Sequence, residues 1–581
     1  MKKSKIRIMA LLLAAMMVTG LFGGCGNKTT TPSEGDELTA IEVTRLMGNG
    51  INLGNTMEAY GRSQYGTKAE VSVYETFWGQ PVTTKEMIEG MKASGFDTLR
   101  IPVAWTNKMN YESGDYTIDA SLLDRVDEII GWAIDAGMFV IVNDHWDGGW
   151  WGMFGSATEE TRNKAMDMYK SMWKQIAEKY AKYDYHLILE SGNEELGNRL
   201  NDTDIARDSG SLSEDECYTM ANTINQTFVD TVRAAGGNNK TRFLLIAGYN
   251  TDIAMTCDDR FKMPTDSANN RLILSVHYYD PSGYTIQMSS SSWGNRQHVE
   301  NMNSTLEKLT KFTDAGYGVI IGEYGVLING KADELRPNTK DYLNNFLNNC
   351  DYYGYCPVMW DCNNYYDKSA CAITNQVIKA LYYSHSFAEQ QKLTEEEVKN
   401  NAKTAMDKQL NLAEVPATIA DDEAVAWIMY NSNDWSTMYR VGDKYPADIT
   451  DGVVSTEPKI TGAGTYTVGL DFTGTANGYA EGTAFSALAI YNGEKLYPGC
   501  IIDIKEIKVN GETYTPTAKG YTTSDDDSCT RVNLYNAWVK DIPKEARTLE
   551  GSLDGYSPVI VDPTGLGKME TLEITFEFIV P

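Results

Sequence analysis

Short apolar segments alternate with longer amphipathic segments between residues 38 and 415. The apolar segments are rich in isoleucine, valine and leucine, as buried strands are. The longer segments, such as 119–138 and 161–183, place apolar residues at helical spacing. The pattern therefore predicts strands that alternate with helices. Eight strands are predicted, at 50–55, 98–103, 138–143, 187–192, 243–248, 272–279, 318–325 and 356–361.

The strong apolar character of these strands indicates how they are arranged. Strands of this kind must be covered on both faces, which is the situation in parallel sheets. Eight strand–helix repeats predict an α/β protein with a (β/α)8 TIM barrel over residues 38–415. A doubly wound sheet is the alternative. No glycine-rich phosphate loop follows the first predicted strand, so a nucleotide-binding version of that sheet is not favoured.

The pattern changes after the barrel. Segment 395–412 predicts one last, exposed helix that leads out of it. Residues 420–581 alternate apolar and polar positions with frequent turns, which is typical of an antiparallel β-sandwich. This domain is either a carbohydrate-binding module, with Trp427, Trp435 and Trp538 as candidate sugar platforms, or a spacer.

The N-terminal segment predicts export. Residues 1–24 contain basic residues, an apolar run and small residues, which is the order found in a bacterial signal peptide. Cys25 follows in LFGGC, which resembles a lipoprotein box and predicts lipidation; a plain signal peptide is the alternative. Residues 25–37 contain no apolar anchor and are expected to form a flexible tether. We expect an extracellular protein anchored to the cell surface.

The net charge and the small number of metal-ligand residues limit the possible binding partners and cofactors. The net charge of −29 disfavours nucleic acid and anionic membranes but leaves a neutral polysaccharide possible. The eight cysteines after Cys25 permit disulfides. Only five histidines are present, and the cysteines lack paired metal-ligand spacing, so neither a metal nor another cofactor is expected. We expect a monomer that touches the membrane only through a lipid anchor.

Polar side chains lie within or at the ends of six predicted strands. The C-terminal strand ends of a TIM barrel carry the active site. One polar strand end would indicate only a turn, but a set on six strands predicts a catalytic constellation. Its members are Arg100, His145, Asn193, Glu194, His277, Tyr279, Glu323 and Trp360.

Glycoside hydrolysis suits this set because it needs two carboxylates, which Glu194 and Glu323 supply. Arg100 is expected to keep Glu323 ionised, while the negative charge of Glu323 should keep Glu194 protonated near neutral pH. Glutamates on two non-adjacent strands can reach inward across the barrel mouth, which favours the short carboxylate separation of a retaining enzyme.

The other polar residues have supporting roles in this interpretation. His277 and Tyr279 can orient the carboxylates and share protons with them. Asn193 can donate to the sugar 2-hydroxyl. Trp360 offers an indole face to a pyranose ring, although a tryptophan that only fills the core is an equal alternative.

Six strand motifs resemble glycoside hydrolase family 5, the cellulase-type β-glycanases, in the family's order. They are GINLGNTMEA, GFDTLRIPVAW, LILESGNEE, VHYYDP, IGEYGV and VMWD, and the resemblance covers residues 40–385. It implies a TIM barrel without a cofactor, with Glu194 as acid/base and Glu323 as nucleophile. It also implies that Arg100, His145, Asn193, His277, Tyr279 and Trp360 complete the site of a retaining endo-β-1,4-glucanase acting on cellulose or related β-glucans.

Two positions depart from the family pattern. Family members usually have proline after the acid/base glutamate, where this chain has Glu195. Either Glu194 or Glu195 could therefore point inward, and we favour Glu194. Many relatives have a histidine pair where this chain has His145 and Trp146, which bears on substrate contacts.

Aromatic residues are dense in the loop after the third predicted strand. Trp146, Trp150 and Trp151 are candidate sugar platforms, together with Trp105 and Trp293 from other loops. The alternative is that about half of them pack against the barrel rim, because tryptophan is usually mostly buried. We expect at least two of the five to contact glycan.

Two whole-chain alternatives remain. The same mechanism could act on xyloglucan or β-mannan, because loop shape decides between these polymers. A non-catalytic glycan-binding lipoprotein is less favoured, because both catalytic carboxylates are present.

Overall fold

The structure is a computed structural model, and residues 39–581 belong to one unit of it. The predicted signal peptide and Cys25 lie outside the described residues. None of the helices in the described part of the chain is both long and apolar enough to span a membrane. The described residues are 34–202, 210–288, 292–328, 335–412, 419–420, 422–440, 448–450, 452–475, 477–524, 529–562 and 566–581.

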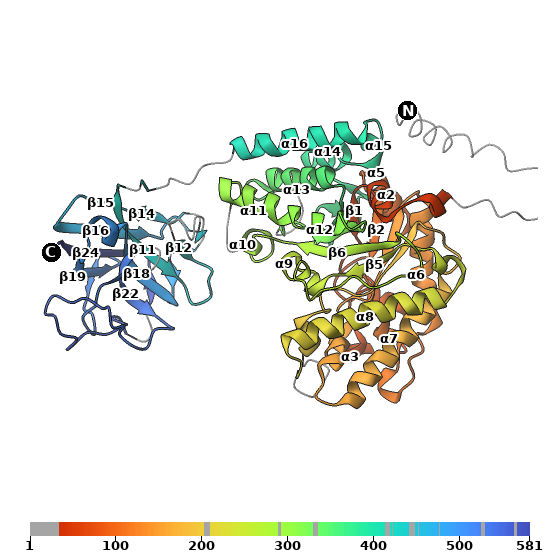
Figure 1. Ribbon diagram of the computed structural model, residues 1–581, viewed down its shortest axis with the longest axis horizontal. Coiled ribbons are helices and arrows are strands. Elements are labelled where there is room, and N and C mark those ends of the chain that lie inside the picture. Colours follow the sequence, from red (N-terminus) through yellow and green to blue (C-terminus); the bar gives the residue numbers. More distant parts are fainter. Residues whose placement is uncertain are drawn as a thin grey trace, which may run out of the picture. The chain divides into compact units, whose positions relative to one another are not determined.

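Eight parallel strands close into a barrel in chain order, with helices around them (Figure 1). The predicted TIM barrel is confirmed, and the doubly wound alternative is wrong. Each predicted strand is present, and most end earlier than predicted because the chain turns into a loop at the carboxyl end. The strands are β1 (Gly50–Asn52), β2 (Thr98–Ile101), β3 (Phe139–Val142), β4 (Leu187–Glu190), β5 (Leu244–Ala247), β6 (Leu272–Tyr278), β7 (Gly318–Tyr324) and β8 (Cys356–Met359).

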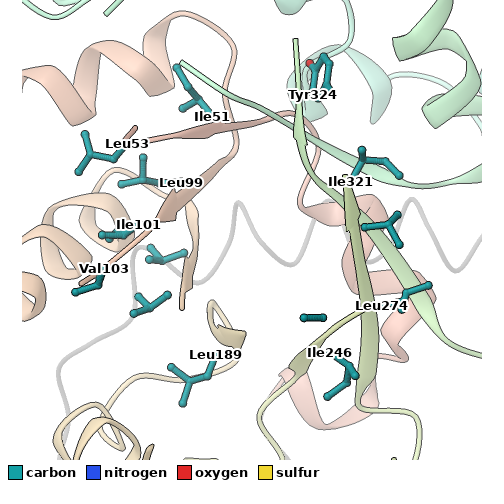
Figure 2. Packing of buried hydrophobic residues seen from close by; sticks show 14 of the residues in the cluster. Ile51, Leu53, Leu99, Ile101, Val103, Leu189, Ile246, Leu274, Ile321 and Tyr324 are labelled. Atoms are coloured by element: carbon teal, nitrogen blue, oxygen red, sulfur yellow. The ribbon is translucent and has the colours of Figure 1, made fainter. Parts of the chain in front are cut away.

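Alternate strand residues face opposite sides of the barrel wall. Apolar residues such as Ile51, Leu99 and Leu189 belong to one large buried cluster, part of which is shown in Figure 2. Their neighbours Asn52, Arg100 and Glu190 are also buried, yet they join one hydrogen-bonded network. The strands therefore direct apolar side chains toward the helices and polar side chains into the barrel.

The main helices cover the barrel, and several begin at hydrogen-bonding caps. Ser213 and Glu216 form a reciprocal capping box at the start of one of them. The principal helices are α2 (Ala40–Leu46), α5 (Lys85–Ala93), α6 (Ala120–Asp135), α7 (Glu159–Lys179), α8 (Glu214–Ala234), α11 (Arg296–Glu307), α13 (Thr339–Tyr353), α14 (Gln376–Ser384) and α16 (Glu395–Leu412).

Short helices occupy the connections between these elements. They are η1 (Glu34–Glu37), α3 (Arg62–Tyr65), α4 (Val71–Glu75), η2 (Trp105–Lys108), η3 (Tyr111–Ser113), η4 (Asp147–Gly155), η5 (Asn198–Asn201), η6 (Gly237–Lys240), η7 (Tyr249–Thr251), α9 (Ile253–Thr256), α10 (Ser282–Thr285), α12 (Thr310–Thr313), α15 (Phe387–Gln390) and α17 (Gly493–Leu496). A small hairpin of β9 (Tyr366–Asp367) and β10 (Ala372–Ile373) follows β8.

Helix α16 differs from the exposed helix that the sequence predicts. It packs on α13 and buries Ala402 and Met406. The two apolar residues, four positions apart, lie on one face of the helix, and this face binds the barrel's outer layer.

The C-terminal region consists of antiparallel sheets whose residues share one buried core, which confirms the β-sandwich. One sheet has the order β13-β12-β11-β18-β22-β21, with β15 beside β11, and the other has the order β14-β16-β24-β19-β20. The predicted domain boundary near residues 415–420 falls largely outside the described residues. The strands are β11 (Ala424–Asn431), β12 (Met438–Arg440), β13 (Asp448–Ile449), β14 (Val454–Thr456), β15 (Lys459–Ile460), β16 (Gly464–Asp471), β17 (Ala480–Glu481), β18 (Phe485–Tyr491), β19 (Ile501–Val509), β20 (Glu512–Tyr514), β21 (Thr523–Ser524), β22 (Thr530–Asn536), β23 (Lys568–Met569) and β24 (Thr571–Ile579).

The eight cysteines after Cys25 all lie among the described residues, and they form no disulfide with one another there. The disulfides that their even number permits are not formed in this structure.

Candidate active site

Arg100 is the hub of the barrel interior, and its side chain is fully buried. Its Nε lies 2.7 Å from Glu190 Oε2, and its Nη2 donates to Asn193 Oδ1 at 2.9 Å. Its Nη1 donates to both Asn52 Oδ1 and Glu323 Oε1, each at 2.9 Å. One guanidinium therefore holds side chains from or beside β1, β4 and β7 in a fixed relative position.

Glu323 and His277 come from neighbouring strands. The pairing of β6 with β7 shifts by one residue after Val276, so that His277 lies opposite Glu323. Such an irregularity re-aims side chains and is frequent beside active sites. His277 Nδ1 lies 3.7 Å from Glu323 Oε2, and the Tyr279 hydroxyl donates to the same oxygen at 3.2 Å.

Glu194 lies at the other end of this cluster, and its side chain is 37% exposed. Its Oε1 is 3.0 Å from His277 Nδ1. One oxygen of Glu194, one nitrogen of His277 and one oxygen of Glu323 all lie within 4.8 Å of one another. Glu195 is buried and reaches neither partner in this way, so Glu194 is the inward member of the pair.

The pKa directions of the two glutamates differ. Burial raises the pKa of Glu323, and the charges of His277 and Arg100 offset only part of that rise. Burial also raises the pKa of Glu194, but the hydrogen bond and charge of His277 lower it more, so the net pKa lies below the ordinary value. Burial lowers the pKa of His277, whereas Glu323 and Glu194 raise it, and the net direction is upward.

These directions are the reverse of those that the sequence predicts for the glutamates. The prediction weighs the two carboxylates and Arg100 alone, but His277 lies between the carboxylates and competes for the proton. The lowered pKa of Glu194 and the raised pKa of His277 favour the histidine for a proton shared between these two side chains. Arg100 lowers the pKa of Glu323, but the burial of this carboxylate raises its pKa by more.

One wall of the site contains Trp360 and His145, whose rings stack with centroids 5.7 Å apart and planes 9° apart. Trp360 is half-buried, so part of its ring is open. A small hollow adjoins it and is lined by Tyr279, Val326, Trp360 and Tyr365, among others. Burial, Arg100 and His277 lower the pKa of His145 well below its ordinary value, so it is neutral.

Four of the five tryptophans expected as sugar platforms are buried. Trp105, Trp150 and Trp151 are 0% exposed and Trp293 is 1% exposed, so none offers an open face. Trp105 Nε1 and Trp151 Nε1 donate to backbone carbonyls of Asn143 and His145, and Trp150 Nε1 donates to Asp144. Their indoles build the loop that carries His145, and only Trp146 is half-exposed. The expectation of at least two platforms among these five is not met in this structure.

Four functional neighbours are missing from the sequence-based set: Asn52, Glu190, Ser275 and Arg199. Ser275 Oγ donates to Glu190 Oε1 at 2.6 Å, which fixes the carboxylate that binds Arg100. Arg199 lies 3.5 Å from Glu194 Oε2. A charged residue within an apolar strand, such as Glu190 in LILE, is a signal that could have revealed the network, because a buried charge needs a partner.

Metal binding is the competing interpretation of the cluster. Glu194, His277 and Glu323 offer three ligand-type atoms at suitable spacing. A cation bound there would lie beside the Arg100 guanidinium, which already bonds Glu323 at 2.9 Å. Repulsion between like charges in this desolvated site disfavours that arrangement. We assign the cluster to proton transfer.

Comparison with known proteins identifies the family. The family model described as cellulase (glycosyl hydrolase family 5) matches residues 62–366, more than half of the chain. The chain belongs to glycosyl hydrolase family 5. It is accordingly a glycoside hydrolase, and the match ends before the β-sandwich.

Individual family 5 relatives agree with this assignment. Endoglucanase A of Paenibacillus barcinonensis is 32% identical over 64% of this chain and 94% of its own length. The xyloglucan-specific endo-β-1,4-glucanase of Bacteroides ovatus is 35% identical over 56% of this chain, and the match spans 65% of that enzyme. The solved structure of a broad specificity endoglucanase from an uncultured bovine rumen ciliate has a TM-score of 0.51 and 31% identity, covering 60% of this chain and 98% of that one.

Proposed function

We propose that this family 5 hydrolase is a retaining endo-β-1,4-glucanase in which Glu323 is the nucleophile and Glu194 the acid/base. The observation that carries the proposal is the separation of the two carboxylates, whose nearest ligand-type oxygens lie within 4.8 Å of each other. Retaining glycosidases place the two carboxyl groups about 5–5.5 Å apart, whereas inverting enzymes need about 6.5–9.5 Å to admit a water.

The reaction then follows in two balanced steps. In the first, a Glu323 oxygen bonds the anomeric carbon while the bond to the leaving oxygen breaks, and that oxygen takes the proton held by the Glu194–His277 pair. In the second, a water oxygen bonds the anomeric carbon as the bond to Glu323 breaks, and Glu194 accepts the water proton. Arg100 and Tyr279 orient the two oxygens of Glu323 for both steps.

The remaining side chains suit a pyranose substrate. Asn193 is fixed by Arg100, so its amide can donate to the 2-hydroxyl as charge develops on the sugar. The open part of the Trp360 ring offers an apolar face for stacking. Because the relatives named above are endoglucanases and a xyloglucanase, a β-1,4-linked glucan backbone is the substrate class best supported, and mannan is not favoured.

A substrate panel tests this assignment. The purified protein should cut carboxymethyl cellulose and mixed-linkage glucan faster than xylan or mannan, and xyloglucan measures tolerance of side chains. Solution viscosity should fall well before reducing ends accumulate, as internal cleavage requires. The matched control is Glu323→Gln, which should be inactive on every polymer. Fastest cleavage of mannan would overturn the substrate proposal.

We further propose that the β-sandwich binds glucan through Trp435 and Trp538. These side chains are 42% and 60% exposed, and their ring centroids are 5.9 Å apart. They follow β11 and β22, whose last residues, Asn431 and Asn536, both pair with Phe485 of β18. Trp427, the third candidate, is 2% exposed and is therefore a core residue.

The backbone at Trp435 strengthens this proposal. Its φ of 60° lies in the left-handed region, which is unusual for a bulky residue and is found where structure holds a side chain for function. In a Glu323→Ala background, the full chain should sediment with insoluble cellulose. A Trp435→Ala/Trp538→Ala variant should sediment less, and a Leu549→Ala control, exposed on the same domain, should not change. Equal sedimentation of all three would favour the spacer role.

We also propose that the protein is exported and anchored to the cell surface by lipid on Cys25. The support is the order of basic, apolar and small residues before this cysteine. Metabolic labelling with a palmitate analogue should mark the protein but not a Cys25→Ala variant, and the variant should appear in the medium. If the unmodified sequence is not labelled either, Cys25 is not lipidated and the segment is a plain signal peptide.

A further inference from the structure

Arg199 connects three carboxylates beside the acid/base. It belongs to η5, five positions after Glu194, and its side chain is 38% exposed. Its Nη1 lies 3.5 Å from Glu194 Oε2 and 3.2 Å from Glu195 Oε1, and its Nε lies 3.2 Å from Asp202 Oδ2. One guanidinium nitrogen therefore lies between the acid/base and its chain neighbour.

The short connection between Glu194 and Arg199 is held in place by close packing. A Cβ at Gly197 would lie 1.9 Å from Asn250 Oδ1, so only glycine fits there. The backbone N–H of Asn250 donates to the Leu196 carbonyl at 2.7 Å. Arg199 is thus presented to the two glutamates by a fixed turn rather than by its side chain alone.

Glu195 is 2% exposed, and its neighbours are mostly acidic. Burial raises the pKa of Glu195, Arg199 lowers it and the charge of Glu194 raises it, and the net result is a pKa of about 7. Asp144 also faces Glu195, and Asp147 lies next to Asp144. On its other side, Glu194 faces His277, Arg100 and Glu323. Among these groups, Arg199 is the cation that pairs directly with Glu195.

We propose that Arg199 and Glu195 form a positioning pair that orients Oε2 of Glu194 and balances the charge beside it. This inference rests on the proposed role of Glu194 as acid/base. Arg199 alone would favour the ionised form of Glu194, which cannot protonate a leaving group. When Glu195 is ionised, its negative charge offsets that effect, so the pair can hold Glu194 without lowering the pKa of Glu194 further.

Variants of Glu195 and Arg199 should shift the pH profile of activity in opposite directions. In the full-length protein, Glu195→Gln leaves the Arg199 charge uncompensated, so the Glu194–His277 pair loses its shared proton at a lower pH. The alkaline side of the kcat/KM profile on cello-oligosaccharides should move down by about one pH unit. This is the low end of the pKa shift of about 1–3 units that a nearby charge causes, because Arg199 is partly exposed. Arg199→Gln removes the cation, and the same side should move up. The double variant should return close to the wild-type profile, and Arg199→Lys should stay there.

Leaving-group dependence gives an independent measurement. An aryl cellobioside with a dinitrophenolate leaving group needs little acid assistance, so Glu195→Gln should change its hydrolysis less than about twofold, while cello-oligosaccharide hydrolysis falls about tenfold. The retained aryl activity also shows that the variant is folded. Equal losses on both substrates, shifts of the same sign, or no restoration in the double variant would each overturn the proposal.

Glu194→Ala distinguishes this failure from failure of the proposed function. If that variant hydrolyses cello-oligosaccharides normally, the acid/base assignment itself is wrong. If it loses that activity while the Glu195 and Arg199 variants keep the wild-type pH profile, only the positioning pair is wrong.

Discussion

Replacing Glu190 by glutamine removes one charge from the centre of the barrel and tests how the site holds Arg100. The carboxylate of Glu190 bonds Arg100 Nε at 2.7 Å, and both side chains are 0% exposed. Ser275 Oγ fixes its other oxygen at 2.6 Å. Glutamine has the same shape and can still accept from Arg100 while it donates to Ser275, so the change is mainly one of charge.

The magnitude follows from the type of bond that is lost. A hydrogen bond to a charged group contributes about 1.5–3 kcal/mol, against about 1 kcal/mol for a neutral one, so Glu190→Gln should cost about 0.5–2 kcal/mol. Since about 1.4 kcal/mol is tenfold in rate, kcat should fall roughly 2- to 30-fold if the loss appears in the transition state. Glu190→Ala breaks a buried ion pair, which typically costs about 3–5 kcal/mol, and should also lower the urea concentration at which activity is lost.

The assay is steady-state hydrolysis of a cello-oligosaccharide together with inactivation in urea. KM should change little, because Glu190 lies beneath Arg100 rather than at the open face of the site. Ser275→Ala is the matched control, because it removes one bond to Glu190 without changing the charge, and its effect on kcat should be smaller. If Glu190→Ala keeps the wild-type kcat and the wild-type resistance to urea, Glu190 does not hold Arg100 in its working position.

Three further predictions concern the catalytic pair and the domain boundary. Glu323→Ala should abolish turnover, whereas Glu194→Ala should still cleave substrates with good leaving groups, and added azide should raise that rate; no effect of azide would argue against the acid/base role. The pH profile of kcat/KM should be bell-shaped. Because the pKa of Glu323 is raised, the nucleophile is protonated earlier as pH falls, so the acidic side should lie above the ordinary glutamate value of about 4.3. Because the pKa of His277 is raised, the shared proton is kept to higher pH, so the alkaline side should lie above the ordinary histidine value of about 6.5; either side at or below these values would contradict the pKa directions. A protein truncated near residue 415 should hydrolyse carboxymethyl cellulose at a rate comparable to that of the full chain. If the truncated protein is insoluble, the sandwich is needed for the barrel to fold.

The barrel and its two central glutamates could be predicted because their signals are local. Apolar segments such as 139–142 are buried along their whole length, and Glu194 and Glu323 stand where such segments end. The sandwich was likewise visible in its alternating pattern, and its sheets bury one shared core.

The features that sequence reasoning missed depend on contacts between distant segments. Trp105 and Trp151 look like surface aromatics in loops, but their indole N–H groups find buried backbone carbonyls. The proton balance depends on the 3.0 Å contact between His277 and Glu194, which no spacing along the chain reveals. Arg199 lies beside Glu194 after a turn at Gly197 that packs closely against Asn250.

The anomeric configuration of the first-formed product tests the central claim most directly. A separation within 4.8 Å between oxygens of Glu194 and Glu323 favours the proposed attack by Glu323 itself, followed by water on the same face of the sugar, over direct attack by a water. Proton NMR recorded during the first minutes of β-glucan hydrolysis, before mutarotation, should therefore show the β-anomer at the new reducing end. An initial α-anomer would mean inversion and would contradict the assigned roles of both glutamates.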